Sequence, residues 1–357
     1  MKKRFSLIIL VLAAVLLLSG CVMGPRAESA PGLTADETDV YIAYRQYVHK
    51  IDLNTGLEKW RYPERGNNTQ IMYAPPLEQD GKLLVGDLAN KLSQISAETG
   101  VVEWTFIQAK GWFQAQPAKN GDLIVAPNSD RNIYGISNDG SLKWTYKSDF
   151  GFLSQPRFSE NKVIVSSLDH KVIAVDTSNG NELWSFPLKG SVVSSALVNE
   201  KGKTIYVGSI GKDFAAIDLE SGNEKWSFDA GGSLDSVWGA PVMIENLVVF
   251  ADESGKIYAL DPASGKSVWT ADAGGTTVVG PVQIPDGFVI ALEDGTIRSY
   301  DSKGNPGWTQ KVDGQVFSTP IVSGDIIVIG VVKSDYLAYA LDLKGNRIWS
   351  FNSSNKK

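Results

Sequence analysis

The 357-residue chain has few of the side chains on which metal sites and nucleophilic catalysis depend. It contains one cysteine and two histidines, His49 and His170. A single cysteine excludes internal disulfides and thiolate zinc clusters, and two histidines leave little for a histidine-rich metal site. Basic residues are also in the minority, with 34 lysines and arginines against 40 aspartates and glutamates. Nucleic-acid binding, which usually depends on a basic excess, is therefore disfavoured.

Long apolar runs are absent after the first twenty residues, and residues 1–20 are predicted to be a lipoprotein signal peptide. Basic residues precede an apolar run from Phe5 to Leu18, which is too short to span a bilayer. The run ends in Leu18-Ser19-Gly20-Cys21, which resembles the bacterial lipobox. We therefore expect Cys21 to carry diacylglycerol and palmitate, and residues 21–35, which contain glycine and proline without periodicity, to form a tether. The alternative is an uncleaved anchor with an incidental cysteine.

The lipobox also predicts where the chain is found. A lipid on Cys21 places the protein outside the cytoplasm, attached to membrane lipid. If the source has two membranes, the valine after the cysteine implies the outer membrane, facing the periplasm. Otherwise the protein lies on the outer face of the cell membrane.

Tryptophan and glycine are abundant, and their placement reveals an internal repeat. Eight tryptophans follow one another at intervals of 39 to 44 residues, and each has a glycine four residues before it. A short polar residue, usually aspartate, lies three or four residues before that glycine. The repeat tryptophans are Trp60, Trp104, Trp144, Trp184, Trp226, Trp269, Trp308 and Trp349. Internal repetition at this period is typical of a solenoid or a propeller.

The segments within each repeat decide between these two architectures. A hydrophobic run such as 123–126 is followed by a polar turn, an alternating segment, the aspartate-to-glycine turn and the tryptophan segment. Most repeats add a proline-marked segment in front, and no convincing amphipathic helix appears. Four strands of about five residues plus turns fill about 40 residues. We therefore predict an all-β fold, an eight-bladed β-propeller of four-stranded antiparallel blades over residues 36–352, with a polar tail at 353–357.

The first repeat is incomplete, because only three of its strands are clearly marked. We predict that residues around Pro31–Asp36 supply its innermost strand, or that this blade has three strands. The C-terminal tail is too short and polar to be a good donor of that strand.

The repeated residues have a structural interpretation. A tryptophan near the end of the outermost strand can lie between adjacent blades, with its indole N–H on a backbone acceptor. The aspartate can accept backbone N–H bonds in an Asx-turn, and the glycine can adopt a positive φ. Calcium binding is disfavoured, because Ca²⁺ needs 6–8 converging oxygens and each turn offers about one carboxylate.

The pattern Ala-x-Asp-x-x-x-Gly-x-x-x-Trp, seen at Ala174, Asp176, Gly180 and Trp184, is similar to the PQQ-like propeller repeat. That group includes quinoprotein dehydrogenases and non-catalytic propellers. An eight-bladed lipoprotein of this size most resembles the BamB family of the outer-membrane β-barrel assembly machinery. The resemblance implies protein partners, namely the barrel-assembly protein of the outer membrane and nascent barrel strands, which propeller edges can bind by strand addition.

Catalysis is not predicted. Quinoprotein dehydrogenases often carry adjacent cysteines and a calcium ion beside the quinone, and neither a Cys-Cys pair nor a calcium-ligand set is recognisable here. His170 falls at a hairpin tip, as do the acid pairs 252–253 and 293–294, which we interpret as surface charge. We therefore expect no enzyme activity, no metal and no cofactor.

The residues before each proline are predicted to border the mouth of the central channel. Two tryptophans there lie outside the repeat, so the fold alone does not require them. The candidate rim and partner-binding residues are Trp112, Phe113, Gln116, Phe152, Gln155, Asp235, Trp238 and Phe317. Plugging of the channel is an equally good interpretation of these residues.

The combined prediction is a lipid-anchored scaffold that binds protein partners. One alternative is a PQQ- or saccharide-binding propeller with a ligand-binding or redox role. Another is a surface adhesion or sensor propeller in a bacterium with a single membrane.

Overall fold

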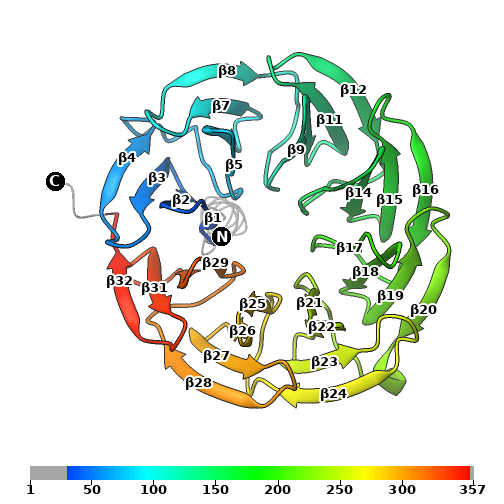
Figure 1. The fold of residues 1–357 in the computed structure, drawn as a ribbon. Coiled ribbons are helices and arrows are strands. Elements are labelled where there is room, and N and C mark those ends of the chain that lie inside the picture. Colours follow the sequence, from blue (N-terminus) through cyan, green and yellow to red (C-terminus); the bar gives the residue numbers. More distant parts are fainter. Residues whose placement is uncertain (1–29, 354–357) are drawn as a thin grey trace, which may run out of the picture.

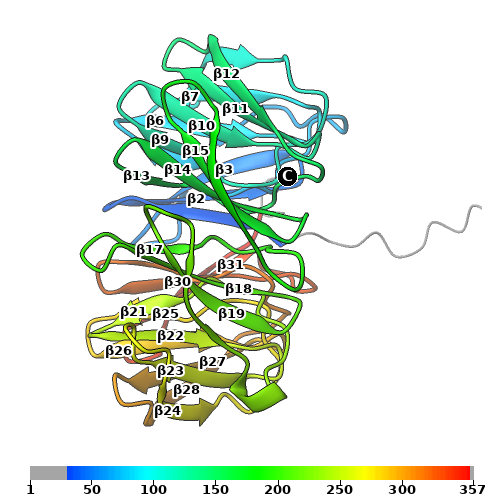
Figure 2. The same cartoon turned by 90° about the vertical axis from the view of Figure 1, so that its right-hand side faces the viewer.

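The computed structural model describes residues 30–353, which form eight four-stranded antiparallel sheets arranged as blades around one axis (Figure 1). Within each blade the strands follow chain order from the axis outward, and in the described part of the chain no strand is exchanged between blades. Figure 2 shows the same ring from the side. The predicted all-β, eight-bladed propeller is confirmed. The predicted signal peptide and Cys21 lie outside the described residues.

Blades one to four contain β1 (Gly32–Ala35), β2 (Asp39–Tyr44), β3 (Tyr47–Asp52), β4 (Glu58–Tyr62), β5 (Leu77–Gln79), β6 (Lys82–Gly86), β7 (Leu92–Ser96), β8 (Val102–Phe106), β9 (Ala118–Asn120), β10 (Leu123–Pro127), β11 (Asn132–Ser137), β12 (Leu142–Lys147), β13 (Arg157–Ser159), β14 (Lys162–Ser167), β15 (Lys171–Asp176) and β16 (Glu182–Pro187). Blades five to eight contain β17 (Leu197–Asn199), β18 (Thr204–Ser209), β19 (Asp213–Asp218), β20 (Glu224–Phe228), β21 (Val242–Ile244), β22 (Leu247–Ala251), β23 (Lys256–Leu260), β24 (Ser267–Asp272), β25 (Val282–Ile284), β26 (Gly287–Ala291), β27 (Thr296–Asp301), β28 (Pro306–Lys311), β29 (Ile321–Ser323), β30 (Ile326–Gly330), β31 (Ala338–Asp342) and β32 (Arg347–Phe351). One 3-10 turn, η1 (Ala230–Gly232), lies between blades five and six. Within residues 30–353 no helix is long and apolar enough to cross a membrane.

Blade one is completed by its own N-terminal strand. β1 pairs antiparallel with β2, with Thr34 opposite Tyr41. Residues around Pro31–Asp36 therefore supply the innermost strand, which is the first of the two predicted alternatives, while β32 belongs to blade eight. The propeller begins at Gly32 rather than at residue 36, because four residues assigned to the tether are hydrogen-bonded into the sheet.

The hydrophobic core lies between the blades. All six residues of β14 are buried. Their side chains alternate between two junctions, since Ile164 contacts the cluster shared with blade five, and Val163 and Val165 contact the cluster shared with blade three. A strand covered on both faces needs apolar residues at successive positions, which explains the uninterrupted hydrophobic run in each repeat.

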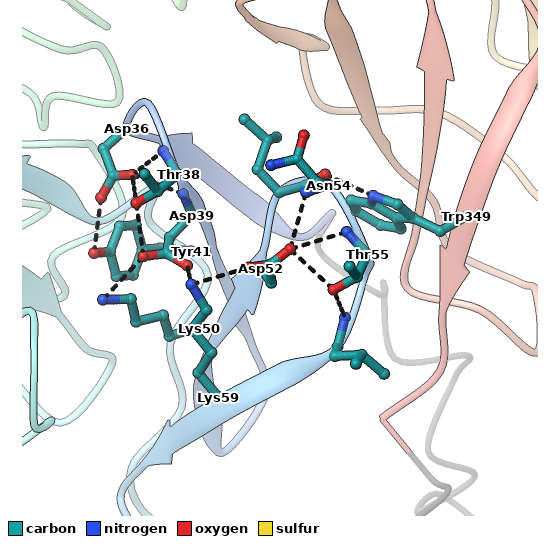
Figure 3. Close-up of polar contacts among 12 residues, drawn as sticks. Asp36, Thr38, Asp39, Tyr41, Lys50, Asp52, Asn54, Thr55, Lys59 and Trp349 are labelled. Carbon is teal, nitrogen blue, oxygen red and sulfur yellow. Dashed lines mark hydrogen bonds and ion pairs between the residues drawn. The ribbon is translucent and has the colours of Figure 1, made fainter.

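The repeat tryptophans join each blade to the next. An added Cβ on Gly265 of blade six would lie 2.6 Å from the ring of Trp226 in blade five, and the same contact recurs at all eight junctions. Six of the eight indole N–H groups donate to a backbone carbonyl of the next blade, as Trp226 does to Pro262 O at 3.0 Å. Trp349 donates to Leu53 O at 2.7 Å and so closes the ring between blades eight and one (Figure 3).

The repeat aspartates form the predicted Asx-turns. Asp52 Oδ1 accepts hydrogen bonds from the hydroxyl and the backbone N–H of Thr55 at 2.9 and 3.0 Å (Figure 3). Asp261 Oδ1 accepts the same pair from Ser264, at 2.7 and 2.8 Å. These bonds favour the charged carboxylate and hold the pKa of Asp52 and of Asp261 below the ordinary aspartate value.

Candidate functional site

Two kinds of loop lie together on one face of the ring, which we call the connection face. One kind connects the outermost strand of a blade to the innermost strand of the next, and the other is the hairpin between the second and third strands. Ser129 N of such a hairpin donates to Trp112 O of a connection at 3.0 Å, and Leu168 N donates to Gly151 O at 3.2 Å. All the predicted rim residues lie in these connections.

Two of the predicted rim residues are core residues instead. Phe113 and Phe152 are each 1% exposed, so their assignment to the rim was wrong. The ring of Phe113 lies 6.3 Å from that of Tyr134 between blades two and three, and Phe152 lies 6.5 Å from Tyr146 between blades three and four. In an extended segment successive side chains point to opposite sides, so every second residue turns into the blade junction.

The three other aromatic candidates and Gln155 reach solvent to different extents. Trp112 and Phe317 are 50% and 37% exposed. Trp238 is half-buried, and its indole N–H donates to Glu253 Oε2 at 3.0 Å. Gln155 is also half-buried. Trp112 is therefore the most accessible of the predicted aromatic residues.

Two of the polar candidates, Asp235 and Gln116, are engaged in contacts within the ring. Asp235 Oδ1 lies 2.9 Å from Lys212 Nζ, and this ion pair holds the pKa of Asp235 below its ordinary value. Gln116 Nε2 donates to Thr34 Oγ1 at 2.9 Å and to Pro76 O at 2.8 Å. Gln116 thus links blade three to blades one and two.

In the next connection, the sequence analysis missed Phe150, and it placed Leu153 before a proline without selecting it as a candidate. Phe150 is 58% exposed and Leu153 is 38% exposed. The backbone of their connection approaches that of Trp112 at Ser129, whose Oγ accepts from Trp112 N at 2.7 Å and whose Cα would lie 3.2 Å from a Cβ added to Gly151. Trp112, Phe150 and Leu153 are called the apolar patch below. The missed signal was Phe150, an aromatic residue that lies further from the proline of its connection than the residues that we considered.

The two histidines do not form a catalytic pair. His49 is 1% exposed, and its Nδ1 lies 3.0 Å from Glu58 Oε1, while Arg61 donates twice to the same carboxylate at 2.7 Å. Burial alone would raise the pKa of Glu58, but the bonds from His49 and Arg61 hold it well below its ordinary value. His170 is exposed at a hairpin with φ +67°. Across the described residues, no three His, Cys, Asp or Glu side chains are grouped so that they could hold a metal ion.

One hairpin acid is buried rather than a surface charge, so that interpretation was wrong for Asp252. It is 1% exposed and accepts hydrogen bonds from Ser254 Oγ at 2.6 Å, Lys256 N at 3.1 Å and Tyr258 OH at 3.1 Å. These donors compensate for its burial, so Asp252 fixes the conformation of its own hairpin.

A charged network replaces the usual tryptophan hydrogen bond between blades one and two, and Figure 3 shows its members Asp39, Lys50 and Lys59. Lys50 Nζ lies 3.1 Å from the Asp39 carboxylate and donates to Ala97 O at 2.9 Å. At six other junctions the equivalent carbonyl accepts an indole N–H; here the buried Trp60 Nε1 has no partner. Lys59 also pairs with Asp39, which raises the pKa of Lys59. The charges compensate one another, so the network supports the junction.

One cavity lies toward the outside of the junction between blades four and five. It has a volume of about 450 Å³ and is lined by Phe186 and Phe228 together with Lys189, Asp213 and Glu224. It lies at the third and fourth strands of blade five and the outermost strand of blade four, away from the axis.

The repeat geometry and the blade junctions define an eight-bladed propeller of PQQ-like repeats. A family profile described as outer membrane protein assembly factor BamB matches residues 44–151, 147–278 and 255–357, and the chain belongs to this family. Among curated proteins, the outer membrane protein assembly factor BamB of Nitrosomonas eutropha is 22% identical over 186 residues. That match covers 51% of this chain and 44% of the relative.

Two solved structures support the fold. BamB from Moraxella catarrhalis matches with a TM-score of 0.71 and 16% identity, over 86% of this chain and 94% of that chain. The computationally designed Ika8 protein matches with a TM-score of 0.76 and 16% identity, over 88% of this chain and 97% of that chain. A designed protein matches as well as a natural one, so the likeness concerns architecture.

Proposed function

We propose that this chain is a membrane-anchored, non-catalytic scaffold that binds an envelope protein through its connection face, in outer-membrane protein assembly. Membership of the BamB family supports the assembly role. The observation that carries the proposal is the apolar patch, in which Trp112 and Phe150 are 50% and 58% exposed. Large exposed apolar side chains that lie together mark interaction sites on soluble surfaces.

The patch is suited to binding because its backbone is held in place. Trp112 donates to Ser129 Oγ at 2.7 Å and accepts from Ser129 N at 3.0 Å. A fixed backbone lowers the entropy lost when the indole contacts a partner. Tryptophan is also among the residues that contribute most to interface energies.

The proposed anchor is Cys21, which would hold the propeller at the membrane through lipid. The proposed location is the outer membrane facing the periplasm, and the proposed partner is the barrel-assembly protein of that membrane. Replacing Cys21 with serine should move the protein from the membrane fraction to the soluble fraction or block its processing. A Cys21→Ser protein that is cut before residue 21 and still sediments with membranes would contradict the anchor.

Co-purification from solubilised membranes, with the bound proteins identified by mass, tests the scaffold function. The variant Trp112→Ala/Phe150→Ala should remain folded and lose its partner. The control Leu57→Ala/Val268→Ala removes residues that are 69% and 57% exposed elsewhere on the ring and should keep the partner. Retention of the partner by both variants contradicts the proposed surface.

A channel-binding propeller gives a different result in the same samples. If the function is to bind PQQ or a saccharide, the bound proteins should be unaffected by the patch variant. Added PQQ should then give a saturable absorbance change with the wild-type chain.

A further inference from the structure

The cavity between blades four and five lies where three other junctions have an aromatic ring. Phe186 lies two residues after the repeat tryptophan of blade four and packs against a cluster that contains Ala215 of blade five. Ala215 carries no ring, and the space beside Phe186 is the cavity of about 450 Å³. At three other junctions the corresponding residues are two rings with centroids 5.2 to 5.4 Å apart, namely Phe106 with Tyr134, Phe228 with Tyr258, and Phe351 with His49.

Blade one shows which groups fill this place when the chain itself supplies them. There the imidazole of His49 and the guanidinium of Arg61 contact the Glu58 carboxylate at 3.0 and 2.7 Å, and His49 also packs on Phe351 of blade eight. Strand register and the distance to the repeat tryptophan identify the corresponding residues around the cavity. They are Ala215 for His49, Ser227 for Arg61, Glu224 for Glu58 and Phe186 for Phe351.

The cavity therefore keeps the aromatic contact surface and the acid of that arrangement but lacks its ring and its cation. Phe186, Ala215, Glu224 and Ser227 all line the cavity. The Glu58 side chain is only 7% exposed beneath its partners. Glu224 is exposed, and within residues 30–353 its carboxylate has no hydrogen-bond or ion-pair partner. The acid is thus available to a cation from outside the chain.

The other charges around the cavity also favour a cationic ligand. Lys189 is the one basic residue that lines it, against Asp213, Glu224 and Asp229. Two of these acids are engaged by backbone donors, since Asp213 accepts from Lys189 N and Asp229 accepts from Gly231 N, both at 2.9 Å. Glu224 is therefore the acid that a ligand would contact.

We propose that this cavity binds an aromatic side chain and a neighbouring arginine from an extended segment of a partner protein. The aromatic ring stacks on Phe186 above Ala215, and the guanidinium forms a bidentate pair with Glu224. Both groups are side chains in the blade-one arrangement, which favours a protein segment as the ligand. In an extended segment, residues two apart point to the same side at a spacing of about 7 Å, so an aromatic-x-arginine sequence presents both groups to the cavity.

This surface is separate from the apolar patch. The cavity lies beside β16 and β20, the outermost strands of blades four and five, which form the outer wall of the ring (Figure 1). A volume of about 450 Å³ is in the range of about 300–1,000 Å³ that is usual for ligand sites. The inference goes beyond the proposed function and does not depend on the connection face.

Isothermal titration of the full chain in zwitterionic lipid nanodiscs, with empty nanodiscs as the blank, tests the ligand chemistry. The probe is the acetylated and amidated peptide Ser-Phe-Ser-Arg-Ser. One counterpart has alanine in place of phenylalanine, and the other has citrulline, which is neutral, in place of arginine. We expect saturable binding of the probe, weakened about tenfold or more by either change, since a ring contact or a charge-assisted pair is lost. A probe that does not saturate, or that binds equally without its ring or its charge, overturns the proposal.

Substitutions in the chain then test the residues. Ala215→His/Ser227→Arg gives blade five the ring and the cation of blade one, and it should abolish probe binding by filling the cavity. Glu224→Gln changes an exposed side chain, should keep the fold, and should weaken binding about tenfold. It therefore tests the site even where the double variant fails to fold.

Two controls should bind the probe as the wild type does. Glu98→Gln removes the same charge from an exposed acid of blade two. Trp112→Ala/Phe150→Ala removes the apolar patch, so its binding separates this cavity from the surface of the proposed function. Unchanged binding by Glu224→Gln, or by a folded Ala215→His/Ser227→Arg protein, overturns the proposal. Loss of binding in the patch variant also overturns it, because the probe would then lie on the connection face.

Discussion

Replacing Gly265 with alanine tests how closely blade six fits against blade five. Gly265 has a φ of +69°, and an added Cβ would lie 2.6 Å from the Trp226 ring. The left-handed backbone costs an L-residue about 1–2 kcal/mol, and forcing a methyl group into a packed junction costs about 1–3 kcal/mol more. We expect Gly265→Ala to lower the free energy of unfolding by about 2–5 kcal/mol.

Removing the Trp226 ring should abolish the packing part of the cost of Gly265→Ala. Trp226 is 9% exposed and donates to Pro262 O at 3.0 Å. Trp226→Ala alone should cost about 3–5 kcal/mol, within the roughly 5–15 kcal/mol that stabilises a typical domain. In the Trp226→Ala background, Gly265→Ala should cost only the backbone term of about 1–2 kcal/mol. The difference is the coupling energy between the two residues.

Urea unfolding of the four proteins, followed by far-UV circular dichroism, measures these free energies. Gly324→Ala is the matched control, because Gly324 has a φ of +55° and open space where its Cβ would lie. It should cost the same in both backgrounds. If Gly265→Ala costs as much without the indole as with it, the tight fit of tryptophan on glycine does not determine the junction.

Three further outcomes are expected from urea unfolding at varied pH. Trp112→Ala should cost less than half as much as Trp226→Ala, because the Trp112 side chain already lies half in water. Glu58→Gln should cost about 3–5 kcal/mol near neutral pH, since it leaves a buried ion pair broken. The lowered pKa of Glu58 means that its stabilisation is present above about pH 4.3 and is lost on acidification. Asp294→Asn should lower the free energy of unfolding by under about 1 kcal/mol. The ion pair with Lys311 lowers the pKa of Asp294 to about 2. The difference in stability between wild type and Asp294→Asn should therefore fade as the pH falls from about 4 to about 2. A large loss of unfolding free energy in Asp294→Asn, or none in Glu58→Gln, would contradict these assignments.

The repeat was sufficient to predict the blades, because the same turn and tryptophan chemistry recurs in every unit. The sequence also predicted the location of Trp226 between blades and, as one of two alternatives, the completion of blade one by β1. It failed where the outcome depends on which way a side chain turns in an irregular connection. Phe113 and Trp112 are neighbours in the chain, yet one is core and the other is exposed. The orientation is set by the hydrogen bonds of Trp112 with Ser129, a hairpin residue that no local pattern connects to it.

Polar residues buried between blades were equally hidden from the sequence. Lys50 Nζ donates to the backbone carbonyl that accepts an indole N–H at other junctions, and this exchange requires Asp39 to lie close to Lys50 in the folded ring.

Each blade consists of one uninterrupted stretch of chain, and this has a consequence for how the ring could be rebuilt. The last junction, between blades eight and one, is held without a peptide link, by contacts such as Trp349 with Leu53 O and Ser323 Oγ with Asp36 O at 2.7 Å. The other seven junctions have the same contact of a tryptophan ring with a glycine and also a covalent connection. The ring therefore has no privileged starting blade: a circularly permuted gene would move the covalent gap to another junction and leave every blade with the same two neighbours.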